Sequence, residues 1–256
     1  MNTFKKIASV FAAAAMALSL AACSNSNGSS SASDSTDDSS AASGSYRTVD
    51  QIKESGEITI GVFSDKNPFG YVDNDGKFQG YDVYFADRIA KDLGVELKLV
   101  PVEAASRVEF LETAKVDIIL ANFTVTDERK ESGWMFSDGY YTATQCMAVA
   151  ENSDIKGFED LKDKQVAVKT GTQGASYAES LKDEYGFTLN YFEDSPTMYQ
   201  AVAGGQAVAC FEDTPIMAAS IKDGGLGLKI VEGTENEGAD YGFAVFNSDE
   251  QELLDM

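Results

Sequence analysis

Strand and helix patterns alternate along the chain from about residue 57 onward. Apolar or alternating runs predict strands at 58–62, 95–99, 116–120, 165–168, 188–192, 207–211, 228–231 and 242–246. Helices are predicted between them, at 81–93, 106–114 and 175–185, and the first has a clear apolar face and ends at Gly94. Ser195 followed by Pro196 predicts the N-cap and first residue of another helix.

Strands that alternate with helices favour parallel sheets, and two series of similar size predict an α/β protein of two lobes. We predict a first lobe at 46–145, to which residues 241–256 return, and a second lobe at 146–240. Two extended segments, Thr142–Ala150 and Tyr241–Phe246, are predicted to cross between the lobes as a hinge.

The first 45 residues differ in character from the rest. Two lysines precede an apolar run of small residues, which predicts a signal peptide at 1–22. The run ends in Leu20-Ala-Ala-Cys23, which resembles the lipobox of bacterial lipoproteins and implies a lipidated (palmitate-bearing) Cys23. An uncleaved membrane anchor is the alternative, and either puts the body outside the cytoplasm. Residues 23–45 are rich in Ser, Ala and Asp, which predicts a disordered, lipid-anchored linker.

Charge and composition exclude several classes of function. The chain carries 20 basic and 42 acidic residues, a formal charge of −22, which disfavours nucleic acid and anionic lipid surfaces as partners. It contains no histidine, so the usual general base and the usual metal ligand are missing. We expect no metal and no cofactor. Cys146 and Cys210 are predicted to be buried free thiols, with a disulfide as the alternative in an oxidising compartment.

Candidate binding residues follow three predicted strands, where open α/β sheets bind ligands. Arg129 could hold a carboxylate through two hydrogen bonds, or could be a surface residue paired with Asp127 or Glu131. The turn Gly171-Thr-Gln-Gly174 could offer backbone amides to an anion, or be an ordinary turn. Asp213 could hold an ammonium group, or only cap the next helix. Together they suit a zwitterionic α-amino acid.

Several motifs, in order and spacing, resemble the polar amino-acid class of solute-binding proteins of ABC importers. They are Gly61-Val62, Pro68-Phe-Gly-Tyr71, Gly80-Tyr-Asp-Val83, Thr124-Val-Thr-Asp-Glu-Arg129, Phe136-Ser-Asp-Gly-Tyr140, Val168-Lys-Thr-Gly-Thr172 and Asp213-Thr-Pro215. The resemblance covers about 48–246. It implies a periplasmic binding protein-like fold, in which two α/β lobes are joined by a two-strand hinge with the ligand cleft between them. It also implies a monomer that docks on a membrane permease.

The resemblance implies a role for each matching residue. Arg129 would bind the ligand α-carboxylate, assisted by Thr124 and the backbone of Asn122. Thr172 and Gln173 would donate from the second lobe, and Asp213 would accept the α-ammonium group.

Two further cations bear on the choice of ligand. Lys66 and Arg107 lie in segments similar to those of cysteine-binding and aspartate/glutamate-binding members, which favours an acidic or small polar ligand. The alternative is that both cations pair at the rim, with Asp65 and Glu109.

Two other functions remain open at this point, namely an enzyme on the same fold, such as a dehydratase, and a surface adhesin or sensor module. Glu212 beside Asp213 is the only tempting acid–base pair, but neighbours on a strand point to opposite faces. Because members of the family usually continue with one or two more helices, the end at Met256 suggests a shortened chain.

Overall fold

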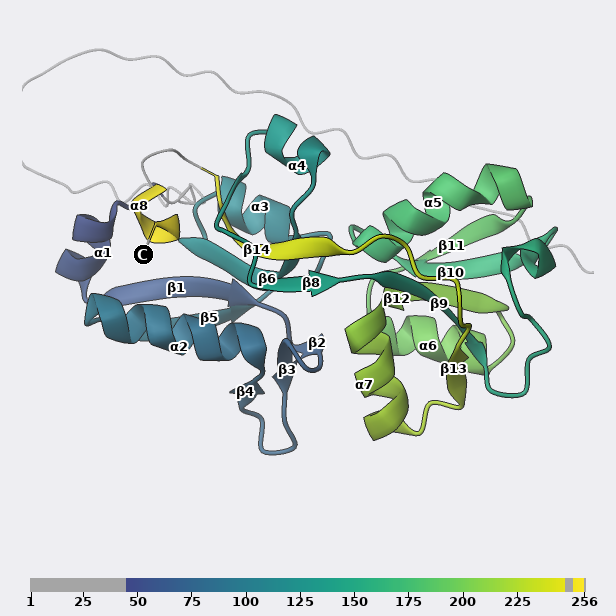
Figure 1. Ribbon diagram of the computed structural model, residues 1–256. Helices are drawn as coiled ribbons and strands as arrows, with labels where there is room; N and C mark the ends of the chain where they lie inside the picture. The colour runs from purple at the N-terminus through teal and green to yellow at the C-terminus, as the bar shows by residue number, and fades with distance from the viewer. Residues whose placement is uncertain (1–44, 247–250, 256) are drawn as a thin grey trace, which may run out of the picture. The chain divides into compact units, whose positions relative to one another are not determined.

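The computed structural model describes residues 45–246 and 251–255. The predicted signal peptide, Cys23 and nearly all of the predicted linker lie outside the described residues. The described part forms two α/β lobes, each built on its own central sheet, so the predicted fold class is confirmed (Figure 1).

The first lobe carries a six-stranded sheet with the order β5-β1-β6-β14-β7, in which β8 also pairs with β14. Its strands are β1 (Glu57–Val62), β5 (Glu96–Pro101), β6 (Ile118–Thr124), β7 (Met135–Phe136), β8 (Tyr141–Ala143) and β14 (Ala239–Val245). β1 is parallel to both β5 and β6, whereas β14 is antiparallel to its neighbours. A small sheet of β2 (Asp65–Lys66), β3 (Gly70–Val72) and β4 (Phe78–Gln79) follows β1. The helices are α1 (Val49–Ser55), α2 (Tyr81–Leu93), α3 (Arg107–Glu112), α4 (Asp127–Glu131) and α8 (Gln251–Leu254).

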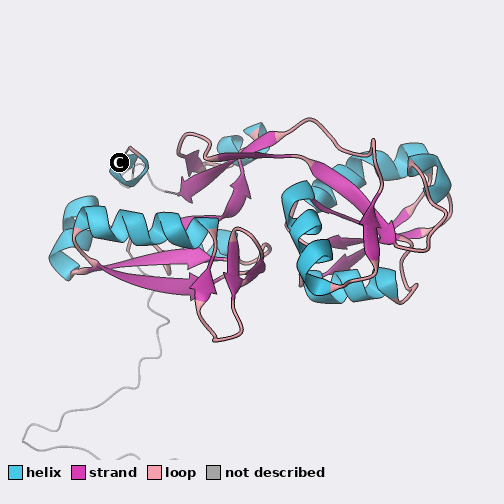
Figure 2. Ribbon diagram, turned by 60° about the horizontal axis from the view of Figure 1, so that its bottom comes forward, coloured by secondary structure: helices cyan, strands magenta, loops and turns pink. Residues whose placement is uncertain are grey.

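The second lobe carries a five-stranded sheet with the order β11-β10-β12-β9-β13. Its strands are β9 (Gln145–Ala150), β10 (Gln165–Lys169), β11 (Thr188–Phe192), β12 (Ala209–Asp213) and β13 (Leu228–Ile230). The helices are the short 3₁₀ helix η1 (Phe158–Leu161), α5 (Gln173–Tyr185), α6 (Ser195–Ala203) and α7 (Thr214–Gly224). Figure 2 shows helices on both sides of this sheet, as expected for parallel strands that are buried on both faces.

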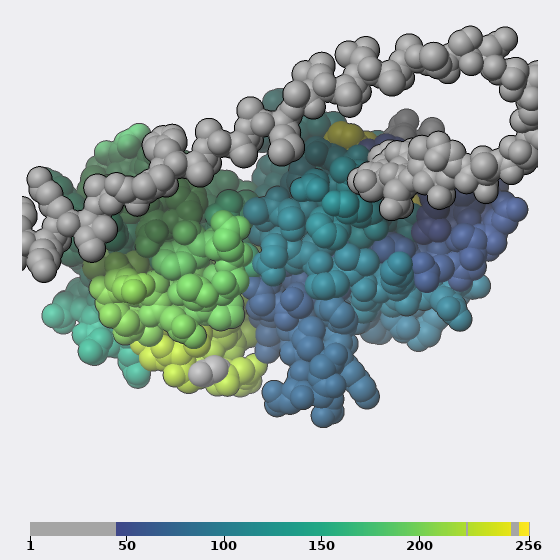
Figure 3. Space-filling model, turned by 180° about the vertical axis from the view of Figure 1, so that it is seen from behind, coloured from purple at the N-terminus to yellow at the C-terminus, as the bar shows by residue number. Residues whose placement is uncertain are grey.

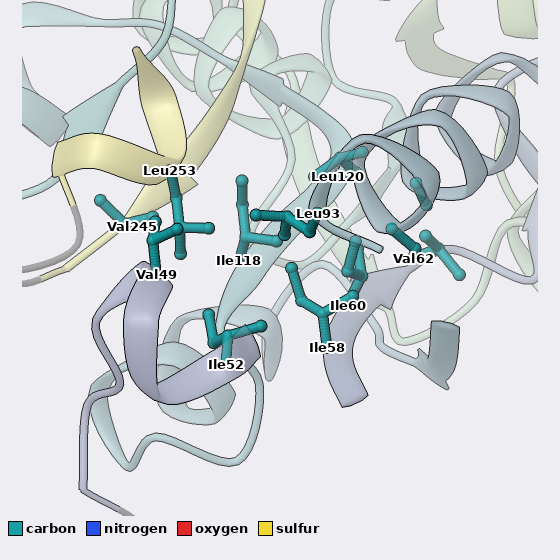
Figure 4. Packing of buried hydrophobic residues seen from close by; sticks show 12 residues of the cluster. Val49, Ile52, Ile58, Ile60, Val62, Leu93, Ile118, Leu120, Val245 and Leu253 are labelled. Atoms are coloured by element: carbon teal, nitrogen blue, oxygen red, sulfur yellow. The ribbon is translucent and has the colours of Figure 1, made fainter. Parts of the chain in front are cut away.

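The core of the first lobe explains why its elements form where the sequence predicts them. Ile58, Ile60, Ile118 and Leu120 of the central strands are fully buried and pack against α2 (Figure 4). Each such side chain stabilises the fold by roughly 1.5–3 kcal/mol. α2 ends where Gly94 takes a left-handed φ of 73° and donates its amide to the last turn.

The chain passes between the sheets twice. The first passage joins β8 to β9, and the second joins β13 to β14, which pairs with β8 from Ala239 onward (Figure 1). Asn236 binds Gln145 across the two passages, with its side-chain oxygen accepting the Gln145 amide at 2.6 Å. Tyr241–Phe246 was predicted to cross, but its strand residues lie within the first sheet, so the second passage comes earlier in the chain.

The N-cap predicted at Ser195 is wrong by one residue. The side chain of Asp194 accepts the Thr197 amide at 2.8 Å, so Asp194 is the cap and Pro196 occupies the second helical position. Among the described helices, none has the length and apolar character needed to cross a bilayer.

Candidate functional site

Arg129 lies just beyond the carboxyl end of β6, in the short helix α4. Thr126 caps this helix, because its hydroxyl accepts the Arg129 amide at 3.2 Å. The guanidinium donates to the Thr124 carbonyl at 2.5 Å and lies 4.4 Å from the centre of the Phe123 ring. It forms no ion pair with any described carboxylate, so the alternative of pairing with Asp127 or Glu131 is wrong. Burial lowers the pKa of Arg129 to about 10.

Arg107 brings a second guanidinium to the same ring. It is 3% exposed, donates to the Ala121 carbonyl at 2.7 Å and lies 4.0 Å from the centre of the Phe123 ring. Its Nε has no hydrogen-bond partner among the described residues. Burial, and then the charge of Arg129, lower its pKa well below the ordinary value. The predicted alternative of a rim pair with Glu109 is wrong, because Glu109 pairs with Lys115 at 3.0 Å.

The start of α5 faces these guanidiniums from the second lobe. Thr172 caps the helix, since its hydroxyl accepts the Ala175 amide at 3.2 Å. Gly171 has a φ of 73°, and a Cβ there would lie 2.9 Å from the Ala104 carbonyl of the first lobe. Glycine is therefore required both by the backbone conformation and by the close approach of the lobes. The Gly171 carbonyl accepts from Arg107 Nη2 at 3.4 Å.

Asp213 ends β12 and is 6% exposed. One carboxylate oxygen accepts from the Asn122 side chain at 3.0 Å, and the other accepts from Gln145 Nε2. Asp213 occupies the N-cap position of α7, as the alternative predicts, but its side chain makes no capping hydrogen bond there and is directed to Asn122 and Gln145 instead. Burial, followed by the charge of Glu212, raises the pKa of Asp213 to about 6.

Lys66 is buried in the protein rather than exposed at a rim. Its ammonium donates to Glu212 at 2.5 Å and to Ser195 at 2.7 Å, both in the second lobe. Burial disfavours the charged form, but the carboxylates of Glu212 and Asp65 outweigh it and raise the pKa of Lys66. The predicted alternative, in which Lys66 and Asp65 pair at the rim, is wrong because Lys66 is only 1% exposed and the ion pair of Asp65 is with Lys169, at 3.0 Å.

Sequence analysis missed two polar residues of this region. Lys169 is 1% exposed and reaches from the second lobe to Asp65 at 3.0 Å and Glu103 at 2.9 Å in the first. Its place directly after the apolar residues 166–168 is a usable signal, because a lysine at the end of a buried strand needs a charged partner. The sequence offers no comparable signal for Gln145, because a polar residue directly before an apolar run can have many roles.

In the sequence, Asp82 is notable only as part of the motif Gly80-Tyr-Asp-Val83. In the structure it binds Asn122, a residue of the site. It is fully buried, and its carboxylate accepts the Asn122 amide at 3.0 Å and the Tyr140 hydroxyl at 2.6 Å. Burial raises its pKa to about 7. Asn122 has a φ of 33°, an uncommon conformation for a residue other than glycine. Asp82 therefore holds Asn122 in the conformation that turns its side chain to Asp213.

Two cavities meet at these residues. The outer cleft, of about 390 Å³, is lined by both arginines and Phe123 from the first lobe and by 171–173 from the second. The inner cavity, of about 10 Å³, is lined by Phe63, Lys66, Arg107, Asn122, Thr124, Thr172, Gln173 and Asp213. Arg107, Thr172 and Gln173 line both. Seen from behind, the first lobe in blue and the second in green meet along a seam (Figure 3).

The arrangement can hold a small zwitterion. The outer cleft supplies two guanidiniums that pair with no carboxylate in the described part of the chain, and the inner cavity supplies the Asp213 carboxylate. The side-chain oxygens of Asn122 and Gln145 are buried acceptors without a partner among the described residues. Unpaired buried polar atoms are costly, and a bound ligand would satisfy them. The described residues contain no cluster of acidic or thiol groups that could hold a metal ion. Cys146 and Cys210 are both buried and free, as predicted.

Three proteins show what the chain is similar to. It is 32% identical over 169 residues to an L-cystine-binding protein of Escherichia coli, a match that covers 64% of this chain and 62% of the relative. The solved structure of a solute receptor for L-cysteine of Neisseria gonorrhoeae matches with a TM-score of 0.76 and 36% identity, over 82% of this chain and 84% of that one. The arginine-bound form of an arginine-binding protein of T. maritima matches with a TM-score of 0.75 and 34% identity, over 80% of this chain and 95% of that one.

The chain spans less than two thirds of the length of the E. coli relative. The match to the family model is more extensive, because it runs over residues 58–256 and so includes both sheets and every candidate site residue except Cys23. The chain belongs to the bacterial extracellular solute-binding proteins, family 3.

Proposed function

We propose that the protein is the extracytoplasmic solute-binding component of an ABC importer, tethered to the membrane through a lipidated Cys23. It binds a small polar amino acid, with glutamate, aspartate or cysteine favoured, by closing the two lobes about the hinge. It acts as a monomer, delivers the ligand to a membrane permease and catalyses no reaction. The names of relatives that bind cystine and cysteine support an amino-acid ligand.

The observation that carries this proposal is the pairing of opposite charges across adjoining cavities. Arg129 has no carboxylate partner among the described residues and takes the α-carboxylate, with Thr124 of the adjoining inner cavity beside it. The backbone amide of Asn122, also proposed for this end of the ligand, already donates to Asp82, so Asn122 assists through its remaining groups. The Asp213 carboxylate accepts hydrogen bonds from two side-chain amides, forms no ion pair with a described residue, and takes the α-ammonium group. Charge-assisted hydrogen bonds of this kind are about twice as strong as neutral ones. Thr172 and Gln173 add contacts from the second lobe.

The proposed absence of catalysis is supported by the surroundings of Glu212. Its carboxylate accepts from Lys66, from the Tyr199 hydroxyl at 2.9 Å and from the Asp213 amide at 3.0 Å. A carboxylate that is buried and bound in this way is not a free general base.

The test is calorimetric titration of the full chain with the common amino acids and cystine. We expect at least one amino acid to bind the wild type and Arg129→Ala to lose binding of all of them, because Arg107 alone, whose guanidinium already donates to the Ala121 and Gly171 carbonyls, cannot hold the α-carboxylate. Lys130→Ala removes an exposed cation one residue away and serves as the matched control. Unchanged affinity in Arg129→Ala would refute the role of this residue, provided that circular dichroism shows the same fold.

A further inference from the structure

We infer that the site takes a zwitterionic amino acid with a short, uncharged side chain, because Glu212 neutralises Lys66 within the protein and the ligand α-carboxylate takes up the charges of Arg107 and Arg129. The inference rests on the proposed function and narrows its ligands, since it favours the cysteine-like class over glutamate and aspartate.

Lys66 is one of two cations that line the inner cavity from the first lobe, and Arg107 is the other. Two of its three ammonium protons are bound, one by Glu212 at 2.5 Å and one by Ser195 at 2.7 Å. Lys66 and Glu212 are 1% and 2% exposed, so water does not screen the pair. A ligand carboxylate would have to compete with a carboxylate that is already in contact. Lys66 therefore lines the cavity as half of a neutral ion pair and offers no free positive charge to a ligand.

The charged side chains around both cavities also leave no positive excess that a second ligand carboxylate could use. The cations are Lys66, Lys169, Arg107 and Arg129, and the carboxylates are Glu212, Asp65, Glu103 and Asp213, together with the exposed Glu112 and Glu128 of the outer cleft. Four positive and six negative charges leave no positive excess that would favour a ligand with a net negative charge. An acidic amino acid would add one uncompensated negative charge. It would also approach a chain whose formal charge is −22.

Arg107 belongs to the carboxylate end of the ligand. The guanidiniums of Arg107 and Arg129 lie 4.0 and 4.4 Å from the centre of the same Phe123 ring, and both line the outer cleft. The charge of Arg129 helps to lower the pKa of Arg107, so the two guanidiniums repel each other, and a ligand carboxylate in the outer cleft that both line would relieve this repulsion. If Arg107 binds the α-carboxylate in this way, it is not available to bind a second carboxylate in the ligand side chain.

The size of the inner cavity favours a short side chain. The inner cavity, of about 10 Å³, has room for roughly one water molecule. Phe63 and Lys66 line this cavity but not the outer cleft. A short ligand side chain needs only a small shift of Phe63 and Lys66, whereas a long one would separate Lys66 from Glu212.

The decisive experiment is calorimetric titration of the full chain with cysteine, serine, aspartate and glutamate. We expect the wild type to bind an uncharged amino acid at least about tenfold more tightly than either acid. Glu212→Gln frees the ammonium of Lys66, so the preference should shift toward the acids by at least about tenfold. Glu109→Gln is the matched control, because it breaks the exposed pair with Lys115 and should leave the preference unchanged.

A second variant covers the case in which Glu212→Gln does not fold. The double variant Lys66→Met/Glu212→Gln keeps these two positions neutral, and we expect it to retain the wild-type preference. A shift toward the acids in the double variant would overturn the inference. Equal or tighter binding of glutamate or aspartate by the wild type would overturn the inference but leave the proposed function standing. If no amino acid bound the wild type, the proposed function would fail and the inference with it.

Discussion

Replacement of Asp82 by asparagine tests the electrostatics of the site without touching the ligand. Asp82 is fully buried and its pKa is raised from 3.8 to about 7, chiefly by burial. Between those pH values the folded protein holds a proton that the unfolded chain has released. The free energy of unfolding therefore falls as the pH rises through this window, and the whole difference corresponds to about 4 kcal/mol.

The variant Asp82→Asn removes this titration, but it also has a cost that does not depend on pH. The two side-chain oxygens of Asp82 accept hydrogen bonds from the Asn122 amide and the Tyr140 hydroxyl, whereas an asparagine side chain has a single oxygen and turns its NH2 group toward the other donor. The lost bond should destabilise the variant by about 1–3 kcal/mol. At pH 4.5 this loss dominates. At pH 7.5 most of the wild type holds a buried, charged Asp82, which lowers its free energy of unfolding. Between pH 4.5 and 7.5 the free energy of unfolding of the variant should therefore rise by about 3 kcal/mol relative to that of the wild type.

The assay is urea unfolding of both proteins at several pH values from 4.5 to 7.5. The difference between the two unfolding free energies is the quantity to follow, because other groups that titrate in this range, including Asp213, contribute to both proteins. We expect this difference to change steadily in favour of the variant as the pH rises. A difference that stays constant, or that moves toward the wild type, would refute the assignment of a raised pKa to Asp82.

Two further predictions concern stability and are measured by the same unfolding assay. Gly80 has a φ of 117°, and a Cβ there would lie 2.1 Å from the Phe69 carbonyl, so Gly80→Ala should destabilise the fold by about 3 kcal/mol or more. The matched control Gly76→Ala, with a φ of 78° and no atom within 4 Å, should cost only about 1–2 kcal/mol, and equal costs would contradict the steric argument. Ile118 is fully buried in the core of the first lobe, so Ile118→Ala should cost about 2–5 kcal/mol, whereas a cost below about 1 kcal/mol would show that the core collapses around the cavity.

The sequence predicts the local structure well where one strong signal dominates. α2 occupies the predicted residues 81–93, because its apolar face and Gly94 act together. The cap of α6 was displaced because Asp194 and Ser195 are both good caps, and proline is accepted in either of the first two helical positions. Adjacent residues with equal propensity leave a boundary undecided until the helix packs.

The partners of the buried charges could not be predicted in the same way. Lys66 contacts Glu212 and Lys169 contacts Asp65, and each pair is separated by more than 100 residues. No periodicity links residues so distant, since the contacts arise only when two sheets of different lobes approach each other. The sequence therefore indicated that Lys66 belongs to the candidate site, but it did not indicate the partner of this lysine. The prediction paired it with the ligand or with Asp65 at the rim, whereas Glu212 neutralises it in the interior.

The polar character of the contacts between the lobes bears on the hinge closure that the proposed function requires. Lys66–Glu212, Lys169–Asp65 and Asn122–Asp213 all join one lobe to the other. The Coulombic attraction of a buried ion pair is largely offset by the lost hydration of its charges, so its net contribution to closure is small. An apolar seam would instead favour closure by about 25 cal/mol for each Å² buried, whether or not a ligand were present. Because a ligand shifts an equilibrium only by its differential affinity for the two states, a near-neutral seam allows the contacts of Arg129 and Asp213 with an amino acid to determine closure.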